Sequence, residues 1–328
     1  MPIPPEHRLW NDFLRVARRR IAGYLPPTPL VRSEFLSREL RRDVFLKLES
    51  LQPVGAFKVR PAFNGILASL QECRAAGVVT NSSGNFAQAV AFAATRLGVD
   101  SCIVMMRGAS EFKRRRTEAF GGKVVVCDDS FRSRAETTER IRKESGRVAL
   151  HPFDSRESIA GNATLGLELL DQIGEDFTLL APISGGGLIA GTALAVKLGR
   201  PDCRIRGVQA QANPSMKRSL EADRRVLTEP SASLADALTV PRPGRNTFAL
   251  VRALVDDVAL VGEEAMRSAI RLLAIEEKLV VEAGGAVSVA AALAAPREVG
   301  GGPLVCVVSG GNIEPNLLRE ILSEPGEA

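Results

Sequence analysis

One lysine of the sequence stands where an amine could act as a nucleophile. Lys58 follows a short apolar segment and opens a helical pattern, directly after Phe57 and two residues before Arg60. An aromatic ring and a second cation close by can lower the pKa of an amine, and an unprotonated lysine forms a Schiff base with a carbonyl compound. Taken alone, the segment favours an ordinary solvated lysine.

Three glycine-rich turns follow short apolar runs, at residues 82–85 (SSGN), 184–187 (SGGG) and 309–312 (SGGN). The second turn leads into an apolar, Ala-rich helical pattern. Backbone N–H groups at such a helix start converge on an anion, so this turn suits a phosphate. It lacks the Lys-Ser/Thr pair of a Walker loop and the GxGxxG spacing of a dinucleotide turn. The alternative is a tight turn in which glycine serves backbone geometry alone.

The elements that position these residues alternate between short β-branched runs and stretches of helical length. Strands are predicted at residues 44–48, 77–80, 101–105, 123–126, 178–181, 205–208 and 304–308. This alternation predicts an α/β fold with largely parallel sheets. The runs VVV at 124–126 and LVCVV at 304–308 are apolar at successive positions, as expected for strands covered on both faces. Because ligands collect at the carboxyl ends of parallel strands, the three turns are expected to share one site.

The composition is that of a globular protein. The chain has 328 residues, of which 45% are hydrophobic and 25% charged, and its formal net charge is +5. So long and apolar a chain can bury a large core, which excludes disorder, and its length suggests about two domains. Basic clusters at 18–20 and 113–116 are interpreted as solvated helix faces. Aromatic residues make up 5%, with one Trp and one Tyr, which argues against a nucleic-acid partner.

Cysteine usage and hydropathy indicate the compartment. The five cysteines are odd in number and lack CxxC spacing, which suits buried, reduced thiols. No apolar run reaches the length of a membrane span, and the amino terminus lacks the apolar core of a signal peptide. The two histidines argue against a histidine-rich metal site. We expect a cytoplasmic protein without membrane association.

Several motifs, in this order and at this spacing, change the interpretation of Lys58. They are GAFKVR at 55–60, SSGN at 82–85, HPFD at 151–154, IAG at 159–161, SGGG at 184–187, KLVVE at 278–282 and SGGN at 309–312. The chain resembles the serine/threonine dehydratase-like branch of the pyridoxal-phosphate enzymes of fold type II. The resemblance runs from the TPL at 28–30 to Asn312, which is nearly the whole chain.

The resemblance implies both a fold and a cofactor. The expected fold has two open, mostly parallel sheets flanked by helices, with pyridoxal 5′-phosphate in the cleft between a large and a small domain. The large domain would comprise residues 1–68 and 154–328, and the small domain residues 69–153. The substrate would be a small amino acid, and the protein a homodimer or a higher homo-oligomer.

The resemblance also assigns roles to individual residues. The residues implied to bind the cofactor are Phe57, Lys58, Asn85, Ser184, Gly185, Gly186, Gly187, Leu188, Glu282 and Ser309. Those implied to bind the substrate carboxylate are Ser82, Ser83, Asn85 and Phe86. Lys58 would hold the cofactor and then remove the α-proton, residues 184–188 would form the phosphate cup, and Ser309 would face the pyridine nitrogen. In racemases of the family, the serine matching Ser83 faces the lysine across the substrate.

The implied activity is removal of water from a β-hydroxy amino acid of the L-threonine or L-serine type, followed by release of ammonia. Ser309 is a neutral partner for the pyridine nitrogen, so the cofactor would be a weaker electron sink, which favours loss of a β-leaving group. The alternatives are an amino-acid racemase, because of Ser83, and a β-replacement synthase. A binding protein that has lost catalysis is a further alternative, against which Lys58 argues. The residues leave the physiological substrate open.

Some positions depart from the family pattern. Phe86 stands where histidine is usual, and Ala56, Pro61 and Ala237 stand where serine, glycine and glycine are commoner. Many relatives bind a divalent cation through two acidic residues. Here Gln209 and Ser215 occupy those positions. Hard cations prefer charged oxygen ligands, so we expect no metal at this place.

Overall fold

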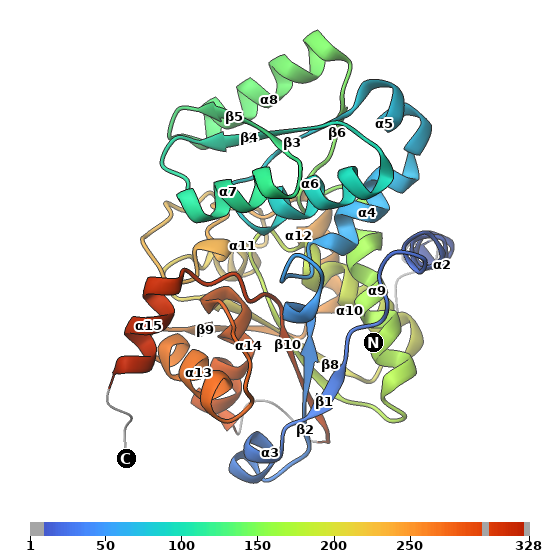
Figure 1. Ribbon diagram of the computed structural model, residues 1–328. Helices are drawn as coiled ribbons and strands as arrows, with labels where there is room; N and C mark the ends of the chain where they lie inside the picture. The colour runs from blue at the N-terminus through green and yellow to red at the C-terminus, as the bar shows by residue number, and fades with distance from the viewer. Residues whose placement is uncertain (1–9, 297–301, 325–328) are drawn as a thin grey trace.

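The structure of the chain is a computed structural model that describes residues 10–296 and 302–324. It contains two β-sheets, each flanked by helices (Figure 1). The strands are β1 (Leu30–Arg32), β2 (Val44–Leu48), β3 (Val78–Asn81), β4 (Ser101–Met106), β5 (Lys123–Cys127), β6 (Val148–Ala149), β7 (Thr178–Pro182), β8 (Arg204–Ala210), β9 (Asp257–Val261) and β10 (Leu304–Val308).

Helices separate most of these strands along the chain. The α-helices are α2 (Trp10–Ile21), α3 (Glu34–Leu40), α4 (Val59–Ala68), α5 (Leu70–Ala76), α6 (Asn85–Leu97), α7 (Glu111–Ala119), α8 (Phe131–Ser145), α9 (Arg156–Gln172), α10 (Gly187–Gly199), α11 (Ser215–Glu221), α12 (Arg245–Leu254), α13 (Glu263–Ile275), α14 (Ala283–Ala294) and α15 (Pro315–Ser323). Two short 3-10 helices, η1 (Glu49–Leu51) and η2 (Asp236–Leu238), complete the described elements.

The larger sheet has the strand order β1-β2-β10-β7-β8-β9. The edge strand β1 is antiparallel to β2, and the other pairs are parallel. Helices α13 and α14 pack on one face, while α9, α10 and α12 enclose the core on the other. All residues of β10 are buried, as the apolar run LVCVV predicts for a strand covered on both faces.

The smaller sheet has the order β5-β4-β3-β6, with all neighbours parallel. In Figure 1 it forms the upper part of the molecule, with α8 above it and α6 and α7 below. The expectation that the run VVV at 124–126 is covered on both faces is wrong. Strand β5 lies at the sheet edge, and Val126 is 46% exposed. An edge strand lacks a neighbour on one side, so apolar side chains there stay partly in solvent.

The predicted α/β fold with two mostly parallel sheets is confirmed, with every predicted strand present to within two residues at each end. The sequence analysis does not predict β1, β6 and β9, because two are very short and the third carries a charged first residue. Strands of the smaller sheet lie within residues 78–149, inside the predicted small domain. The domain boundaries themselves stay a prediction, and the ends of the predicted large domain, 1–9 and 325–328, lie outside the described residues.

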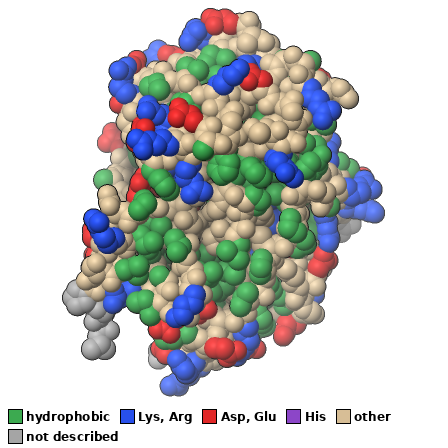
Figure 2. Space-filling view, in the orientation of Figure 1, with side chains coloured by type: hydrophobic (Ala, Val, Ile, Leu, Met, Phe, Trp, Pro, Cys, Tyr) green, Lys and Arg blue, Asp and Glu red, His purple; other side chains and the backbone are tan. Residues whose placement is uncertain are grey.

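The five cysteines are free and buried, as expected for reduced thiols. Among the described residues, no helix is long and apolar enough to cross a membrane. On the face seen in Figure 2, hydrophobic side chains gather across the middle of the molecule, and charged ones are more frequent toward its edges.

Candidate active site

A cavity of about 760 Å³ is lined by residues from the loops that follow strands of both sheets. Every residue that the sequence analysis singled out for the cofactor or the substrate carboxylate lies in its wall. The three glycine-rich turns therefore meet at one place, because each follows the carboxyl end of a parallel strand. The wall is therefore a candidate active site.

Lys58 stands at the N-cap position of α4 and turns its amine toward the cavity. Its Nζ donates a hydrogen bond to the Pro152 carbonyl at 3.2 Å and lies 4.9 Å from the centre of the Phe57 ring and 5.7 Å from that of Phe86. Burial lowers the pKa of Lys58 to about 8, and the charge of Glu282 opposes this shift. A fraction of the amine is therefore neutral near pH 7, as nucleophilic chemistry requires.

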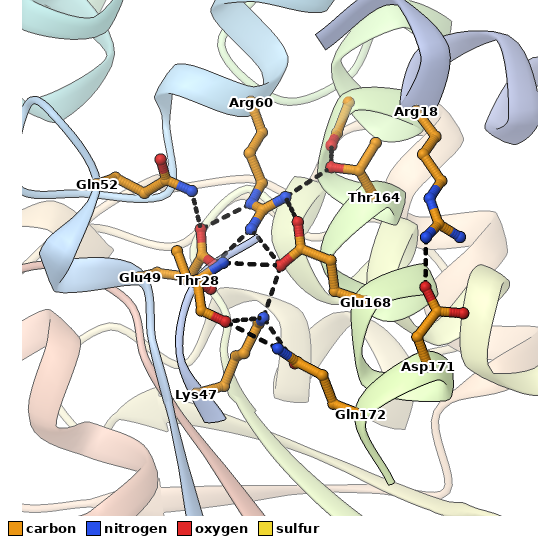
Figure 3. A network of polar contacts seen from close by, with 11 residues as sticks. Arg18, Thr28, Lys47, Glu49, Gln52, Arg60, Thr164, Glu168, Asp171 and Gln172 are labelled. Carbon is orange, nitrogen blue, oxygen red and sulfur yellow. Dashed lines mark hydrogen bonds and ion pairs between the residues drawn. The ribbon is translucent and has the colours of Figure 1, made fainter. Parts of the chain in front are cut away.

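A buried polar network holds the start of α4 in place (Figure 3). The Arg60 guanidinium donates to both carboxylate oxygens of Glu49, at 2.8 Å each, and to both of Glu168, at 2.6 and 2.8 Å. Lys47 Nζ donates to the same Glu168 carboxylate at 2.6 Å. Two cations thus balance two anions away from solvent, which ties β2, η1, α4 and α9 together. Lys58 is two residues from the centre of this network.

The turn at residues 184–188 joins β7 to α10 and requires glycine. Gly186 has φ +97°, and a Cβ on Gly185 would meet the Phe153 ring at 2.6 Å. No described residue accepts a hydrogen bond from the backbone N–H groups of residues 185–188. Residues 185–188 line the cavity at the amino-terminal end of α10, so these free donors and the positive end of the helix dipole suit a phosphate.

The loop at residues 82–84 joins β3 to α6. Ser83 Oγ accepts from the Met106 N–H at 3.3 Å, and Ser82 Oγ accepts from the Gly84 N–H at the same distance. Both hydroxyls can still donate to an anion in the cavity. Phe86, in the first turn of α6, is 2% exposed. This loop offers hydroxyls and helix-start N–H groups, a suitable seat for a carboxylate.

Glu282 stands at the N-cap position of α14, where its side chain makes no capping hydrogen bond, and it lines the cavity. Its Oε1 accepts from Asn85 Nδ2 at 2.5 Å, while its Oε2 is buried without a hydrogen-bond partner in the protein. Burial raises the pKa of Glu282 to about 7, an effect that Lys113 opposes. Asn312 Nδ2 donates to Asn85 Oδ1 at 2.8 Å, so Asn85 retains one N–H for a ligand. Ser309 Oγ donates to the Gly284 carbonyl at 3.3 Å.

Several residues of the wall carry no signal in the sequence. Lys113 of α7 is 6% exposed and forms an ion pair with Asp236 of η2, which links the two sides of the cavity. Arg134 of α8 also lines the cavity and lies over the Phe131 ring. Lys113 belongs to the basic cluster at 113–116, and the expectation of a solvated helix face is wrong for this residue. No local pattern reveals it, because the partner is 123 residues away.

The wall satisfies the chemical requirements of pyridoxal 5′-phosphate. Lys58 supplies a partly neutral amine for the aldehyde, and the 184–188 turn supplies unpaired N–H groups for the phosphate. The unpartnered Glu282 Oε2 and the unused N–H of Asn85 are polar groups available to a ligand. Ser309 places a neutral hydroxyl in the wall, which can donate to a ring nitrogen in place of the Gly284 carbonyl. The residues therefore fit the cofactor.

Two mostly parallel sheets, with a lysine, a glycine turn suited to a phosphate and a hydroxyl-bearing loop suited to a carboxylate in one cavity, are the features of a pyridoxal-phosphate enzyme of fold type II. The sequence profile described as "Pyridoxal-phosphate dependent enzyme" matches residues 21–310, and the chain belongs to this family.

Similar proteins show to which branch of the family the chain belongs. An L-threonine ammonia-lyase of Thermotoga maritima is 38% identical over 95% of this chain and 78% of its own length. One of Geobacter sulfurreducens is 41% identical over 95% of this chain and 76% of its own length. The resemblance to the serine/threonine dehydratase-like branch is thereby confirmed.

Solved structures agree with this placement. Maize serine racemase superposes with a TM-score of 0.89 at 37% identity, covering 94% of this chain and 95% of its own. The processed form of threonine deaminase isoform 2 from Solanum lycopersicum superposes with a TM-score of 0.91 at 30% identity, covering 98% of this chain and 89% of its own.

Proposed function

We propose that this enzyme is an ammonia-lyase that converts a β-hydroxy amino acid, L-threonine or L-serine, to a 2-oxo acid and ammonia. One observation carries the proposal. Lys58, whose pKa burial lowers to about 8, lines the same cavity as the glycine turn at 184–188 and the serine hydroxyls of the 82–84 loop. The relatives named as L-threonine ammonia-lyases support the choice of substrate.

Each group of residues in the cavity wall would have its own role in this reaction. Bound pyridoxal 5′-phosphate supplies the electron sink that stabilises negative charge at the substrate α-carbon. Lys58 would hold it and, once released, accept the α-proton at Nζ, because a buried amine of lowered pKa is a competent base near neutral pH. The N–H groups of residues 185–188 would bind the phosphate. Ser82 and Ser83 would hold the substrate carboxylate through their hydroxyls, which fixes the α-carbon relative to Lys58.

Ser309 favours elimination over reactions that need a long-lived carbanion. Its hydroxyl is neutral, and it donates to the Gly284 carbonyl in the structure. A ring nitrogen facing Ser309 would meet no carboxylate to stabilise its protonated form. Charge at the α-carbon would then be relieved by loss of the β-hydroxyl, which would take up a proton and leave as water, so that elimination would need no protein base besides Lys58.

The test is a comparison of Lys58→Ala with Lys123→Ala, a matched control at an exposed lysine. The parent holoenzyme should release 2-oxo acid from L-threonine or L-serine, and borohydride reduction followed by peptide mass spectrometry should place the cofactor on Lys58. Lys58→Ala should lose both properties, and Lys123→Ala neither. A cofactor adduct on another lysine, or a parent that forms no 2-oxo acid from any β-hydroxy amino acid, would refute the proposal.

Racemisation is the second candidate, and Ser83 is the observation that favours it. Ser83 lines the same cavity as Lys58. Its oxygen accepts a hydrogen bond from the Met106 N–H, so the hydrogen of its hydroxyl can still be donated to a substrate. Two proton-transferring groups on opposite sides of an α-carbon permit inversion. The likeness to maize serine racemase supports this candidate, which chiral analysis of recovered substrate distinguishes from elimination.

We further propose that the enzyme works in the cytoplasm as a homodimer or higher homo-oligomer, without a nucleic-acid or membrane partner. The five free, buried cysteines support a reducing compartment. Light scattering of the holoenzyme measures the assembly, and a monomeric mass at working concentration would contradict that part of the proposal.

A further inference from the structure

A buried polar segment extends from the end of β8 to the start of α11. Gln209, Asn213 and Ser215 are each at most 2% exposed. Gln209 Nε2 donates to the Asn213 carbonyl at 3.3 Å, and Gln209 Oε1 accepts from the Lys217 N–H at 2.9 Å. Both ends of one side-chain amide thus close the turn between β8 and α11.

The segment is connected to the cavity through Ser215. Its Oγ donates to the Val240 carbonyl at 2.9 Å, and the Val240 N–H donates to Ser184 Oγ at 3.3 Å. Val240 and Ser184 both line the cavity, and Ser184 begins the phosphate-binding turn. The polar contacts of Ser215 therefore lead to the cofactor site, and Gln209 closes the turn in which Ser215 lies.

Many relatives of the branch that this chain resembles bind a divalent cation at the corresponding positions, and the residues of this chain do not fit one. A cation needs oxygen lone pairs, preferably charged. Gln209 instead directs its N–H₂ at the Asn213 carbonyl, and the Ser215 hydroxyl directs its hydrogen at Val240. Within residues 10–296 and 302–324, no group of three or more His, Cys, Asp and Glu side chains could hold a metal ion.

We propose that Gln209 and Ser215 are positioning residues, which hold the Ser184 end of the cofactor site by neutral hydrogen bonds and make the site independent of divalent cations. A bound ion fastens a loop by coordinating its carbonyl oxygens, and here two side-chain donors bind carbonyl oxygens directly. The inference rests on the proposed function only in taking residues 184–188 as the phosphate seat.

The first experiment separates positioning from general packing. Ser215→Ala removes the donor to Val240, while the control Ser219→Ala removes an equally buried hydroxyl of α11 that bonds the Ser215 carbonyl and the Val226 N–H. Cofactor retention by each holoenzyme is measured by absorbance after dilution. Ser215→Ala should retain cofactor about five- to tenfold more weakly, as expected for one buried hydrogen bond, with recovery in excess cofactor. Equal weakening in the control would overturn the positioning role.

The second experiment uses Mg²⁺ and Ca²⁺ alone. Parent holoenzyme treated with a chelator should keep its melting temperature and its cofactor, and adding either cation should change neither. Loss on chelation that a cation restores would overturn the inference. The double variant Gln209→Glu/Ser215→Asp places two carboxylates in the turn and should gain a melting temperature that rises with Ca²⁺. If the double variant folds and its melting temperature responds to neither cation, that result would also count against the inference that Gln209 and Ser215 take the place of a bound cation.

These readouts are independent of lyase activity. If no β-hydroxy amino acid is consumed, the proposed function fails, yet cofactor retention and the cation response still decide the role of Gln209 and Ser215.

Discussion

Replacing Arg60 by methionine should destabilise the protein strongly, because it unbalances a buried group of charges. In the network of Figure 3, Lys47 and Arg60 face Glu49 and Glu168, and the side chains of Arg60 and Glu49 are 0% exposed. Arg60→Met keeps much of the side-chain volume but leaves two carboxylates against one ammonium group. It also removes every hydrogen bond that Arg60 donates to the two carboxylates.

The size of the effect follows from burial. Removing one partner of a buried, hydrogen-bonded ion pair costs about 3–5 kcal/mol, whereas an exposed pair contributes about 0.2–1 kcal/mol. At roughly 2 °C per kcal/mol for a chain of this size, the melting temperature of Arg60→Met should fall by about 6–10 °C. The control is Arg18→Met, whose pair with Asp171 is about half exposed and should matter little.

The loss should also depend on pH. Burial raises the pKa of Glu49, but the charge and hydrogen bonds of Arg60 outweigh burial and hold that pKa below its usual range. In the parent, this pairing therefore contributes stability above the unfolded pKa of the carboxyl. Without Arg60, burial dominates and the folded pKa rises, so stability falls as pH increases. The difference between parent and Arg60→Met should widen from pH 5 to pH 8.

Thermal and urea unfolding followed by circular dichroism measure these differences. The double variant Glu49→Gln/Arg60→Met restores the charge balance and should be more stable than Arg60→Met alone, because no uncompensated charge remains buried. Two results would refute this expectation. One is that Arg60→Met lowers the free energy of unfolding as little as Arg18→Met does. The other is that the double variant loses at least as much stability as Glu49→Gln and Arg60→Met lose together when each is made alone.

Three further outcomes are expected. Ser83→Ala should abolish any racemisation and leave measurable dehydration of the L-substrate, and unchanged α-deuterium exchange with inversion would show that another group faces Lys58. Gly185→Ala should weaken cofactor binding by about tenfold or more, because its Cβ would meet the Phe153 ring at 2.6 Å, and an unaltered cofactor titration would contradict this packing. In cofactor-free protein, burial raises the pKa of Glu282 to about 7, so its contribution to stability is full below about pH 4.5 and lost as pH rises through 7. Glu282→Gln should therefore remove up to about 3 kcal/mol of pH dependence, measured by urea unfolding between pH 5 and 8.

Much of the site could be predicted because its parts are local in sequence. A glycine-rich turn between an apolar strand and a helix specifies its own backbone, and parallel strands carry all such turns to one edge. The turn at 184–187, the loop at 82–85 and the turn at 309–312 needed no knowledge of packing to be placed together. Lys58 could be interpreted as a reactive lysine only together with these motifs, since nothing in its own segment distinguishes it from a solvated lysine.

Tertiary structure decided what depends on distant neighbours. The runs VVV and LVCVV look alike in sequence, yet β10 is central and buried while β5 forms an edge, because strand order is a property of the whole sheet.

Charges follow the same rule. Sequence alone gives no sign that Arg60 is buried, because burial becomes tolerable only when Glu168, 108 residues away, supplies the opposite charge. The raised pKa of Glu282 and its bond to Asn85, across 197 residues, likewise arise only on folding. Short motifs thus determine the local backbone conformation of the site. The pKa values of its charged groups depend instead on which distant segments pack together and exclude water from those groups.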